Sequence, residues 1–250
     1  MDSKKTIVIS GGTSGIGLAT ARILVAQGHN VILLGRSVEK GEKAVDTLAA
    51  YAGQVRFIAA DVCDESACQR ALAQGEIYFG AVHGLVTAAG QYEEKLLQYE
   101  TLAAIEKLFA VNVYGTMTLC RLIQPYLRRS AGGSIVTVSS DAGLQGNVAC
   151  SVYGATKGAI VAFTKSYALE AAPYGIRVNC VCPGDVQTPL LREQLQRNPK
   201  LTMSELREHY PLYRIAEPAE VGEVIAFLLS EKASFMTGTA VPVDGGLTSW

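Results

Sequence analysis

Apolar, β-rich runs alternate with helical patterns along almost the whole of this 250-residue sequence. Several runs, such as Thr6–Ser10, are apolar without alternation, as in strands that are buried on both faces. Such strands separated by helices predict an α/β fold, a doubly wound parallel sheet of about seven strands with helices on both faces and right-handed crossovers. The expected strands cover residues 6–10, 30–34, 55–59, 82–88, 134–138, 177–182 and 239–243. The expected helices cover residues 15–27, 38–51, 65–74, 102–129, 152–172 and 218–230.

The composition indicates a compact globular protein with a sizeable core. Hydrophobic residues make up 49% of the chain and charged residues 18%, which argues against disorder. The net charge of −1 gives no field that would attract nucleic acid or an anionic membrane, so neither is expected as a partner. The sequence has no apolar run of about 18 residues and no signal-peptide pattern, which favours a cytoplasmic location with reduced thiols. The six cysteines form no CxxC pair, and no metal site is expected.

A glycine-rich turn follows the first expected strand and opens the first expected helix. It reads Ser-Gly-Gly-Thr-Ser-Gly-Ile-Gly from Ser10 to Gly17. Glycines permit a tight turn and a close approach of the backbone to a ligand, and the helix N-terminus offers free N–H groups to a pyrophosphate. The spacing differs from GxGxxG, because position 20 is Thr, and it is not a P-loop. The residues expected to bind the dinucleotide here are Gly11, Thr13, Ser14, Gly15, Ile16 and Gly17.

The end of the second strand bears on the choice between NADP and NAD. A carboxylate at this place binds the ribose 2′-OH of NAD, whereas an Arg accommodates the 2′-phosphate of NADP. Here Arg36 and Ser37 follow the strand and no acid is present, so NADP(H) is the preferred cofactor and NAD(H) the alternative. Asp61, after the third strand, either accepts a hydrogen bond from the adenine amino group or caps the helix that begins near Asp64.

Tyr153 and Lys157 lie four residues apart in a stretch with a helical pattern. That spacing places both side chains on one helix face. A phenol titrates near ~10, and an adjacent ammonium favours the phenolate and lowers its pKa toward the working range of an acid or base. The alternative is a half-buried Tyr beside a surface Lys.

Together these residues resemble the short-chain dehydrogenase/reductase family, in its single-domain branch of similar length, over essentially the whole chain. The motifs that carry the resemblance are the Gly11/Gly15/Gly17 loop, Asp61-Val62, Asn112, Ser140, Tyr153 with Lys157, Asn179, Pro183-Gly184, Thr188 and Asp244-Gly245-Gly246. The resemblance implies a single Rossmann-type domain over residues 1–250. It also implies hydride transfer between a nicotinamide cofactor and a ketone, aldehyde or secondary alcohol.

The resemblance assigns roles at the chemical end of the site. Tyr153 would be the general acid in reduction and the general base in oxidation. Lys157 would lower its pKa and hold the nicotinamide ribose, and Ser140 would hydrogen-bond the substrate oxygen. Asn112 would hold a water that links Lys157 to solvent, its alternative being a helix residue with local hydrogen bonds. The further residues that the resemblance places at the cofactor are Val62, Ala88, Ala89, Gly90, Pro183, Gly184, Val186 and Thr188.

One motif departs from the family pattern. The family usually carries Asn-Asn-Ala-Gly after the fourth strand, and this chain has Thr-Ala-Ala-Gly from Thr87 to Gly90. Gly90 keeps the close backbone approach to the cofactor. The missing amides usually tie neighbouring strands together, so the departure bears on local rigidity.

The substrate is expected to bind between residues 141–150 and a lid at about 187–211. The walls would be Leu144, Gln145, Asn147, Cys150, Asp185 and Val186. The resemblance further suggests a homotetramer, or a homodimer, built on the two long helices and on the last helix and strand. The alternatives are an NAD-dependent alcohol, sugar or hydroxysteroid dehydrogenase, a 3-oxoacyl-carrier-protein reductase, which Tyr174 before Gly175 disfavours, and a nucleotide-binding regulator that is not an enzyme.

Overall fold

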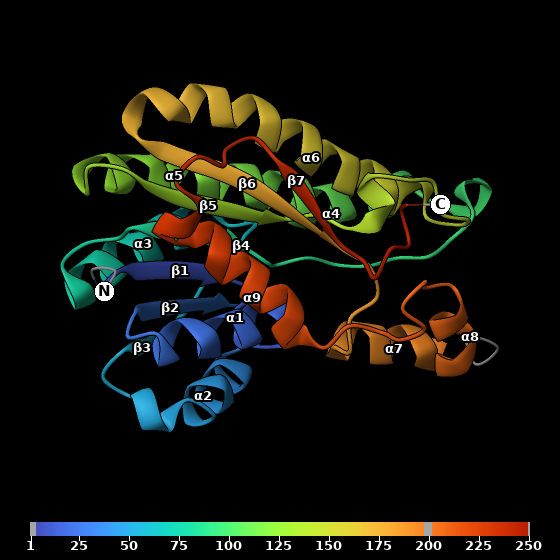
Figure 1. Ribbon diagram of the computed structural model, residues 1–250, viewed down its shortest axis with the longest axis horizontal. Coiled ribbons are helices and arrows are strands. Elements are labelled where there is room, and N and C mark those ends of the chain that lie inside the picture. Colours follow the sequence, from blue (N-terminus) through green and yellow to red (C-terminus); the bar gives the residue numbers. More distant parts are fainter. Residues whose placement is uncertain (1–3, 198–201, 250) are drawn as a thin grey trace.

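The computed structural model describes residues 4–197 and 202–249 of the chain (Figure 1). Within them, seven strands form one sheet in the order β3-β2-β1-β4-β5-β6-β7, and every neighbouring pair is parallel. This arrangement confirms the doubly wound, Rossmann-type α/β fold. The strands are β1 (Thr6–Ser10), β2 (Asn30–Gly35), β3 (Val55–Ala59), β4 (Gly84–Thr87), β5 (Gly133–Val138), β6 (Ile176–Pro183) and β7 (Ala240–Val243).

Helices cover both faces of the sheet, as Figure 1 shows. The helices α1 (Gly15–Ala26), α2 (Val38–Asp46) and α9 (Pro218–Leu229) pack on one face, and α3 (Glu65–Phe79), α5 (Gly115–Arg129) and α6 (Ser151–Ala171) pack on the other. In β1, Ile7 and Ile9 enter the first of these cores and Val8 enters the second. Both faces of a strand must therefore be apolar, which explains the runs without alternation.

Three helices differ from the lengths that the sequence predicts. The helix expected over 38–51 ends at Asp46 and is followed by a 3-10 turn, Ala49–Tyr51. The helix expected over 65–74 continues to Phe79 and ends at Gly80, whose φ of 80° is the left-handed conformation that glycine adopts easily. The helix expected over 102–129 consists of α4 (Leu102–Phe109), a π turn (Ala110–Tyr114) and α5.

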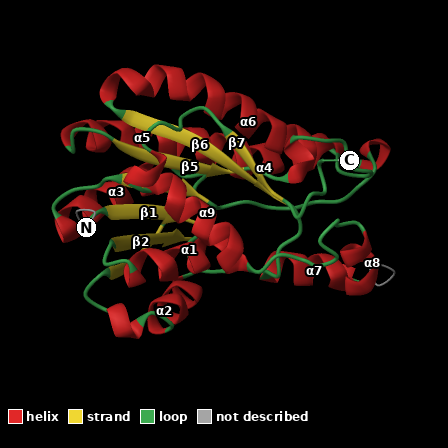
Figure 2. Ribbon diagram, viewed as in Figure 1, coloured by secondary structure: helices red, strands yellow, loops and turns green. Residues whose placement is uncertain are grey.

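Two short helices follow the carboxyl end of β6. These are α7 (Pro189–Arg197) and α8 (Met203–Glu208), which lie beside the sheet layers and apart from the helices that cover its faces (Figure 2). They occupy the stretch 187–211 that the sequence sets apart from the strand–helix alternation. Pro199 and Lys200 in this stretch lie outside the described residues.

The family departure after β4 leaves a polar atom without a partner. The Thr87 hydroxyl is buried, and no described residue forms a hydrogen bond with it. Ser10 connects β1 to this segment instead, since its hydroxyl donates to the Val86 carbonyl at 3.5 Å and accepts from the Ala89 amide at 3.4 Å. These contacts are long, so the segment that leads to Gly90 depends mainly on the backbone pairing of β4.

Thr87→Val is expected to stabilise the protein. The substitution keeps the shape of the side chain and removes a buried hydroxyl that has no partner, which gains about 1 kcal/mol or an increase in Tm of about 2–4 °C. Thermal unfolding followed by circular dichroism measures the change. The matched control is Thr137→Val at the residue that pairs with Thr87 in the sheet register, because the Thr137 hydroxyl bonds Thr164 at 2.7 Å. The control should lower Tm, and a Thr87→Val protein that also loses stability would contradict the assignment.

Candidate active site

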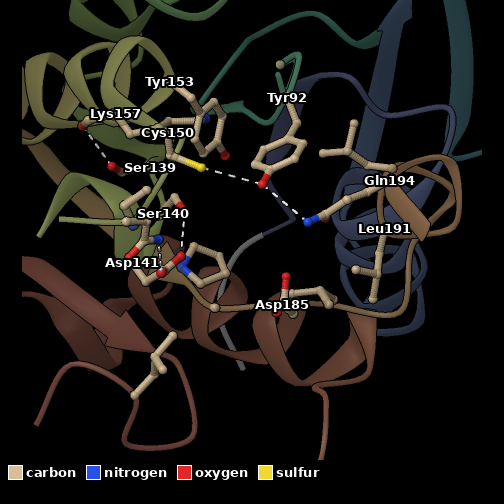
Figure 3. Close-up of a pocket in the computed structure, with 18 of the residues that line it drawn as sticks. Tyr92, Ser139, Ser140, Asp141, Cys150, Tyr153, Lys157, Asp185, Leu191 and Gln194 are labelled. Atoms are coloured by element: carbon tan, nitrogen blue, oxygen red, sulfur yellow. Dashed lines mark hydrogen bonds between the residues drawn. The ribbon is translucent and has the colours of Figure 1, made fainter. Parts of the chain in front are cut away.

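A cavity of about 480 Å³ opens at the carboxyl edge of the sheet (Figure 3). It brings together segments that are far apart in the sequence: the glycine turn, the loops after β4, β5 and β6, the start of α6, and α7 with α8. The residues expected at the site that line it are Ile16, Ala88, Gly90, Ser140, Gln145, Asn147, Cys150, Tyr153, Lys157, Pro183, Gly184, Asp185, Val186 and Thr188. Leu144 is not among the lining residues, so its expected place in the wall is wrong, and Tyr92, Glu94 and Gln194 line the cavity without having been expected there individually.

The catalytic helix α6 turns Tyr153 and Lys157 into this cavity. Both side chains are buried, with exposed fractions of 8% and 6%. The ring of Tyr153 packs edge-on against Tyr92 with 4.8 Å between the centroids, and Lys157 Nζ lies 5.7 Å from the Tyr153 ring centroid. Lys157 Nζ also donates to the Val138 carbonyl at 3.1 Å. The pair is therefore held within the protein, which excludes the alternative of a surface Lys.

Burial dominates the acid–base behaviour of both groups. It raises the pKa of Tyr153, and the charges of Asp141 and Asp185 act in the same direction, while interaction with Ser140 lowers the pKa. The pKa of Tyr153 is therefore raised and not lowered as the sequence predicts, because desolvation of the phenolate is the largest influence on it. Burial also lowers the pKa of Lys157 to about 8.

Ser140 is linked to an acidic neighbour. Its hydroxyl accepts from the Ala142 amide at 3.2 Å and donates to Asp141 Oδ1 at 2.7 Å. The other oxygen of that carboxylate accepts from the Asn147 side chain at 2.8 Å. A hydroxyl has one proton, and Ser140 uses it here in the hydrogen bond to the Asp141 carboxylate. The hydroxyl must therefore rotate before it can donate to a substrate oxygen. The sequence signal for this pair was an acidic residue directly after the strand-end Ser.

Asn112 lies in the π turn between α4 and α5. Its side-chain oxygen accepts from the Gln91 amide at 2.8 Å, and its side-chain nitrogen donates to the Gln91 carbonyl at 3.0 Å and to the Thr156 hydroxyl at 3.1 Å. These partners are distant in sequence, so the alternative of purely local hydrogen bonds is wrong. Asn112 connects the segment after Gly90 to α6, and its role in holding a water stays a prediction.

The glycine turn has the features of a pyrophosphate cradle. Ser14, at the N-cap of α1, makes no side-chain capping bond, and the first turn of the helix contains no acidic residue. Gly11 has a φ of 67°, and a Cβ there would lie 2.6 Å from the Ala89 amide nitrogen. The start of α1 therefore offers N–H groups without a side-chain cap and without an acidic residue in its first turn, which fits a dinucleotide phosphate.

Gly90 leaves room beside the catalytic lysine. A Cβ on Gly90 would lie 3.5 Å from Asn112 Oδ1 and 3.6 Å from Lys157 Nζ. Thr188 approaches from the other side, since its methyl group would lie 3.1 Å from a Cβ on Gly15. The glycine turn, Lys157 and the loop after β6 thus surround one elongated space, as binding of a nicotinamide ribose requires.

The residues expected at the adenosine end lie outside the cavity that contains Tyr153. Arg36 is exposed, and its guanidinium is 4.0 Å from the Asp61 carboxylate. Ser37 caps α2 by accepting from the Lys40 amide at 3.2 Å, and the methyl groups of Val62 pack against Gly115 of α5.

Asp64, and not Asp61, caps α3. Its carboxylate accepts from the Ala67 amide at 3.0 Å. Asp61 accepts instead from the Cys63 amide at 2.9 Å, so the alternative role of Asp61 as the helix cap is wrong.

Within residues 4–197 and 202–249, no group of three or more His, Cys, Asp or Glu side chains is placed to hold a metal ion. No helix in the same range has the length and apolar character needed to cross a membrane.

The sheet, the phosphate cradle and the buried Ser–Tyr–Lys set define a nicotinamide-dependent oxidoreductase that acts on the CH–OH or C=O group. A family model described as "Enoyl-(Acyl carrier protein) reductase" matches residues 11–248. The chain belongs to the short-chain dehydrogenase/reductase family.

Individual known proteins are similar to this chain over most of their own length. L-fucose dehydrogenase from Oryctolagus cuniculus is 38% identical over 245 residues, which are 97% of this chain and 84% of the relative. The solved structure "ElxO with NADP Bound" has a TM-score of 0.92 at 28% identity and covers 99% of this chain and 100% of its own. Aldohexose dehydrogenase from Thermoplasma acidophilum, in ligand-free form, has a TM-score of 0.88 at 30% identity, with coverage of 99% and 95%.

Lys157→Met is expected to stabilise the folded protein at neutral pH. Because the pKa of Lys157 falls from 10.5 to about 8 on folding, the charged form opposes folding fully below pH 8, and this cost fades between pH 8 and pH 10.5. After subtraction of the lost bond to Val138, the gain at pH 7 is on the order of 2 kcal/mol, and it should be smaller at pH 10. Calorimetric melting at both pH values measures it.

Lys165→Met is the control for this substitution. Lys165 is an exposed residue of the same helix, so its replacement should leave Tm almost unchanged at both pH values. A Lys157→Met protein that melts below wild type at pH 7, or a difference that does not depend on pH, would contradict the role of burial.

Proposed function

We propose that this enzyme interconverts a secondary alcohol and a ketone, with NADP(H) preferred over NAD(H) and with Tyr153 moving the proton. The observation that carries the proposal is the burial of Tyr153 and Lys157 in one cavity with Ser140. The relatives named L-fucose dehydrogenase and aldohexose dehydrogenase support an alcohol as the substrate class. The structure of a relative with NADP bound supports the cofactor.

In this mechanism Tyr153 and Ser140 act on the substrate oxygen, and Lys157 binds the ribose of the cofactor. When bound, the nicotinamide supplies or accepts the hydride, which moves with its two electrons between the ring and the carbon that bears the oxygen. Tyr153 Oη gives a proton to the carbonyl oxygen in reduction and removes one from the hydroxyl in oxidation. The Ser140 hydroxyl, rotated away from Asp141, donates to the same oxygen and steadies its developing negative charge. Lys157 holds the ribose hydroxyls and favours the phenolate form of Tyr153.

The raised pKa of Tyr153 has a consequence for the two directions. The phenol is protonated at neutral pH, which is the form that reduction needs. Oxidation requires the phenolate form to receive the proton of the alcohol, and it therefore becomes faster as the pH rises toward the pKa of Tyr153.

The predicted cofactor residues remain part of this proposal. Arg36 and Ser37 would bind the 2′-phosphate, with Arg36 turning from Asp61 toward it. Asp61 and Val62 would contact the adenine. Ala88, Ala89 and the residues from Pro183 to Thr188 would flank the nicotinamide, and Asn112 would hold the water that resupplies the proton.

The whole chain is proposed to act as one domain with residues 187–211 as its lid. The contacts that support a lid are those of Gln194 in α7, which donates to the Tyr92 hydroxyl at 3.2 Å and to Glu94 at 3.3 Å across the cavity. A cytoplasmic location is supported by the six unpaired cysteines. A homotetramer or homodimer is supported by apolar side chains that are exposed on helices α4 and α6, such as Leu102 and Leu169.

Tyr153→Phe should reduce kcat by a factor of about 10²–10⁴, because the variant keeps the ring and loses the proton. Reduction of a panel of ketones with NADPH measures this loss. Fluorescence titration with NADPH should show that the cofactor still binds. The matched control is Tyr167→Phe in the same helix, whose hydroxyl donates to the Cys120 carbonyl at 2.9 Å and does not line the cavity. Full activity of the Tyr153→Phe enzyme would disprove the proposed mechanism.

Arg36→Ala should weaken NADPH binding by about 10- to 100-fold, since a charge-assisted hydrogen bond to the phosphate is lost. NADH binding should change little, because NADH has no 2′-phosphate. Titration with both cofactors measures the ratio of the two dissociation constants. Arg22→Ala, at an exposed position of α1, is the control. Equal affinity of the wild-type enzyme for the two cofactors would overturn the NADP preference.

A further inference from the structure

The wall of the cavity around Tyr153 is unusually acidic and rich in amides. Of the described residues that line the cavity, Lys157 is the only Lys or Arg, and it belongs to the cofactor end. The charged, amide and imidazole side chains of the remaining wall are Glu94, Asp141, Gln145, Asn147, Asp185, Gln194 and His209. Its three carboxylates outnumber the single basic side chain, His209, so a substrate with a carboxylate, a phosphate or a phosphopantetheine arm would meet mainly negative charge here.

Asp141 and Asp185 approach the same space from different loops, and Figure 3 shows them around the opening below Tyr153. Asp141 is buried, with an exposed fraction of 8%, and Asp185 is partly buried. Both residues line the cavity that also contains Tyr153, which places their carboxylates near the reacting atoms. Neither forms an ion pair with a described residue.

The carboxylates are only partly satisfied by neutral donors. Asp185 Oδ2 accepts from the Tyr210 hydroxyl at 2.9 Å, and no described residue bonds Asp185 Oδ1. Asp141 uses one lone pair of each oxygen for Ser140 and Asn147. Since an ionised carboxylate offers about four acceptor positions, both residues retain capacity toward the cavity. A buried carboxylate with unused acceptors favours a ligand that brings hydrogen-bond donors.

The amides decide between two kinds of donor. An ammonium group can satisfy carboxylates, but it has no acceptor for the side-chain N–H groups of Gln145 or for the second N–H group of Asn147, whose first bonds Asp141. A hydroxyl is both a donor and an acceptor, so neighbouring hydroxyls can bond carboxylates and amides together. The mixture of the two side-chain types therefore matches a polyol better than an amine, and it matches a simple apolar ketone least.

We propose that the substrate is a neutral polyhydroxylated compound, a sugar or cyclitol, whose hydroxyls next to the reacting carbon are bound by Asp185 and Asp141. Asp185 is the residue that determines this specificity, and Asp141 both contacts the substrate and positions Ser140. The inference rests on the proposed function. In oxidation, the carbinol C–H bond breaks as hydride passes to NADP⁺, the O–H proton passes to Tyr153, and the C=O bond forms.

A series of ring alcohols tests the substrate class without altering the protein. The wild-type enzyme and NADP⁺ or NAD⁺ are assayed with cyclohexanol, cis- and trans-cyclohexane-1,2-diol, 2-aminocyclohexanol, 2-hydroxycyclohexanecarboxylate, myo-inositol and a panel of hexoses. We expect kcat/KM for the best diol or sugar to exceed that for cyclohexanol by about tenfold or more. The amino alcohol should be a poorer substrate than the diol, and the carboxylate the poorest.

Each other outcome has a definite meaning. A preference for the amino alcohol would show a cation-binding pocket and overturn the inference, as would equal rates for cyclohexanol and all the hydroxylated compounds. Turnover of simple ketones with no oxidation of any polyol would overturn the inference and leave the proposed function intact. No turnover of any alcohol, sugar or simple ketone with either cofactor would instead overturn the proposed function.

Asp185→Asn tests the residue. The substitution keeps the shape of the side chain, and we expect it to reduce kcat/KM for the preferred polyol by about tenfold or more, mainly through KM. The rate with cyclohexanol should fall by a smaller factor than the rate with the polyol, since cyclohexanol has no second hydroxyl for Asp185 to bind. Asp46→Asn, at an exposed position of α2, is the control. An equal loss for cyclohexanol and the polyol would show a structural role for Asp185 and overturn its part in specificity.

Discussion

Every strand in this protein is paired in parallel, and that one constraint determines where the chemistry lies. Parallel strands need a crossover for each pairing, so helices must cover both faces and the strands must be apolar on both sides. The same rule directs all the carboxyl ends to one edge. At the boundary between β1 and β4 the strand order reverses, and the two crossovers diverge to leave a crevice. Segments that follow the carboxyl ends of the strands therefore meet at this crevice. They are the glycine turn, Gly90, Ser140 and the loop after β6.

The active site is built from charged and polar groups that the fold buries at a cost in free energy. Lys157 is desolvated between α6 and the sheet, Asp141 is buried and Asp185 is partly buried, and neither carboxylate forms a salt bridge with a described residue. Each is stabilised by a small number of precise hydrogen bonds from neutral groups. A low-dielectric surrounding also strengthens every interaction with a developing charge, so the feature that weakens the fold is the one that makes the site effective.

The sequence predicted the features that depend on local pattern. The strand positions, the phosphate turn and the placement of Tyr153 with Lys157 on one helix face all follow from periodicity and spacing. The features that it could not predict depend on what packs around a residue. The direction of the Tyr153 pKa follows from burial by Tyr92, which is distant in sequence, and the π turn at Asn112 has no glycine or proline to announce it. The role of Asp141 likewise required the side-chain geometry of the Ser140 loop. Most residues expected at the chemical end line one cavity, whereas those expected at the adenosine end lie outside it.

The segment around α7 and α8, which lines one side of the cavity, has a small hydrophobic core of its own. Leu191, Leu206, Tyr210 and Ile215 form a cluster that is separate from the two cores of the sheet. Mutations in this cluster therefore change the shape of the substrate site with little effect on the stability of the sheet or on the glycine turn. Evolution can vary this segment independently of the rest of the molecule. A catalytic centre that tolerates few changes is thus combined with a cover that tolerates many, which allows one fold to acquire new substrates by drift in a short stretch of sequence.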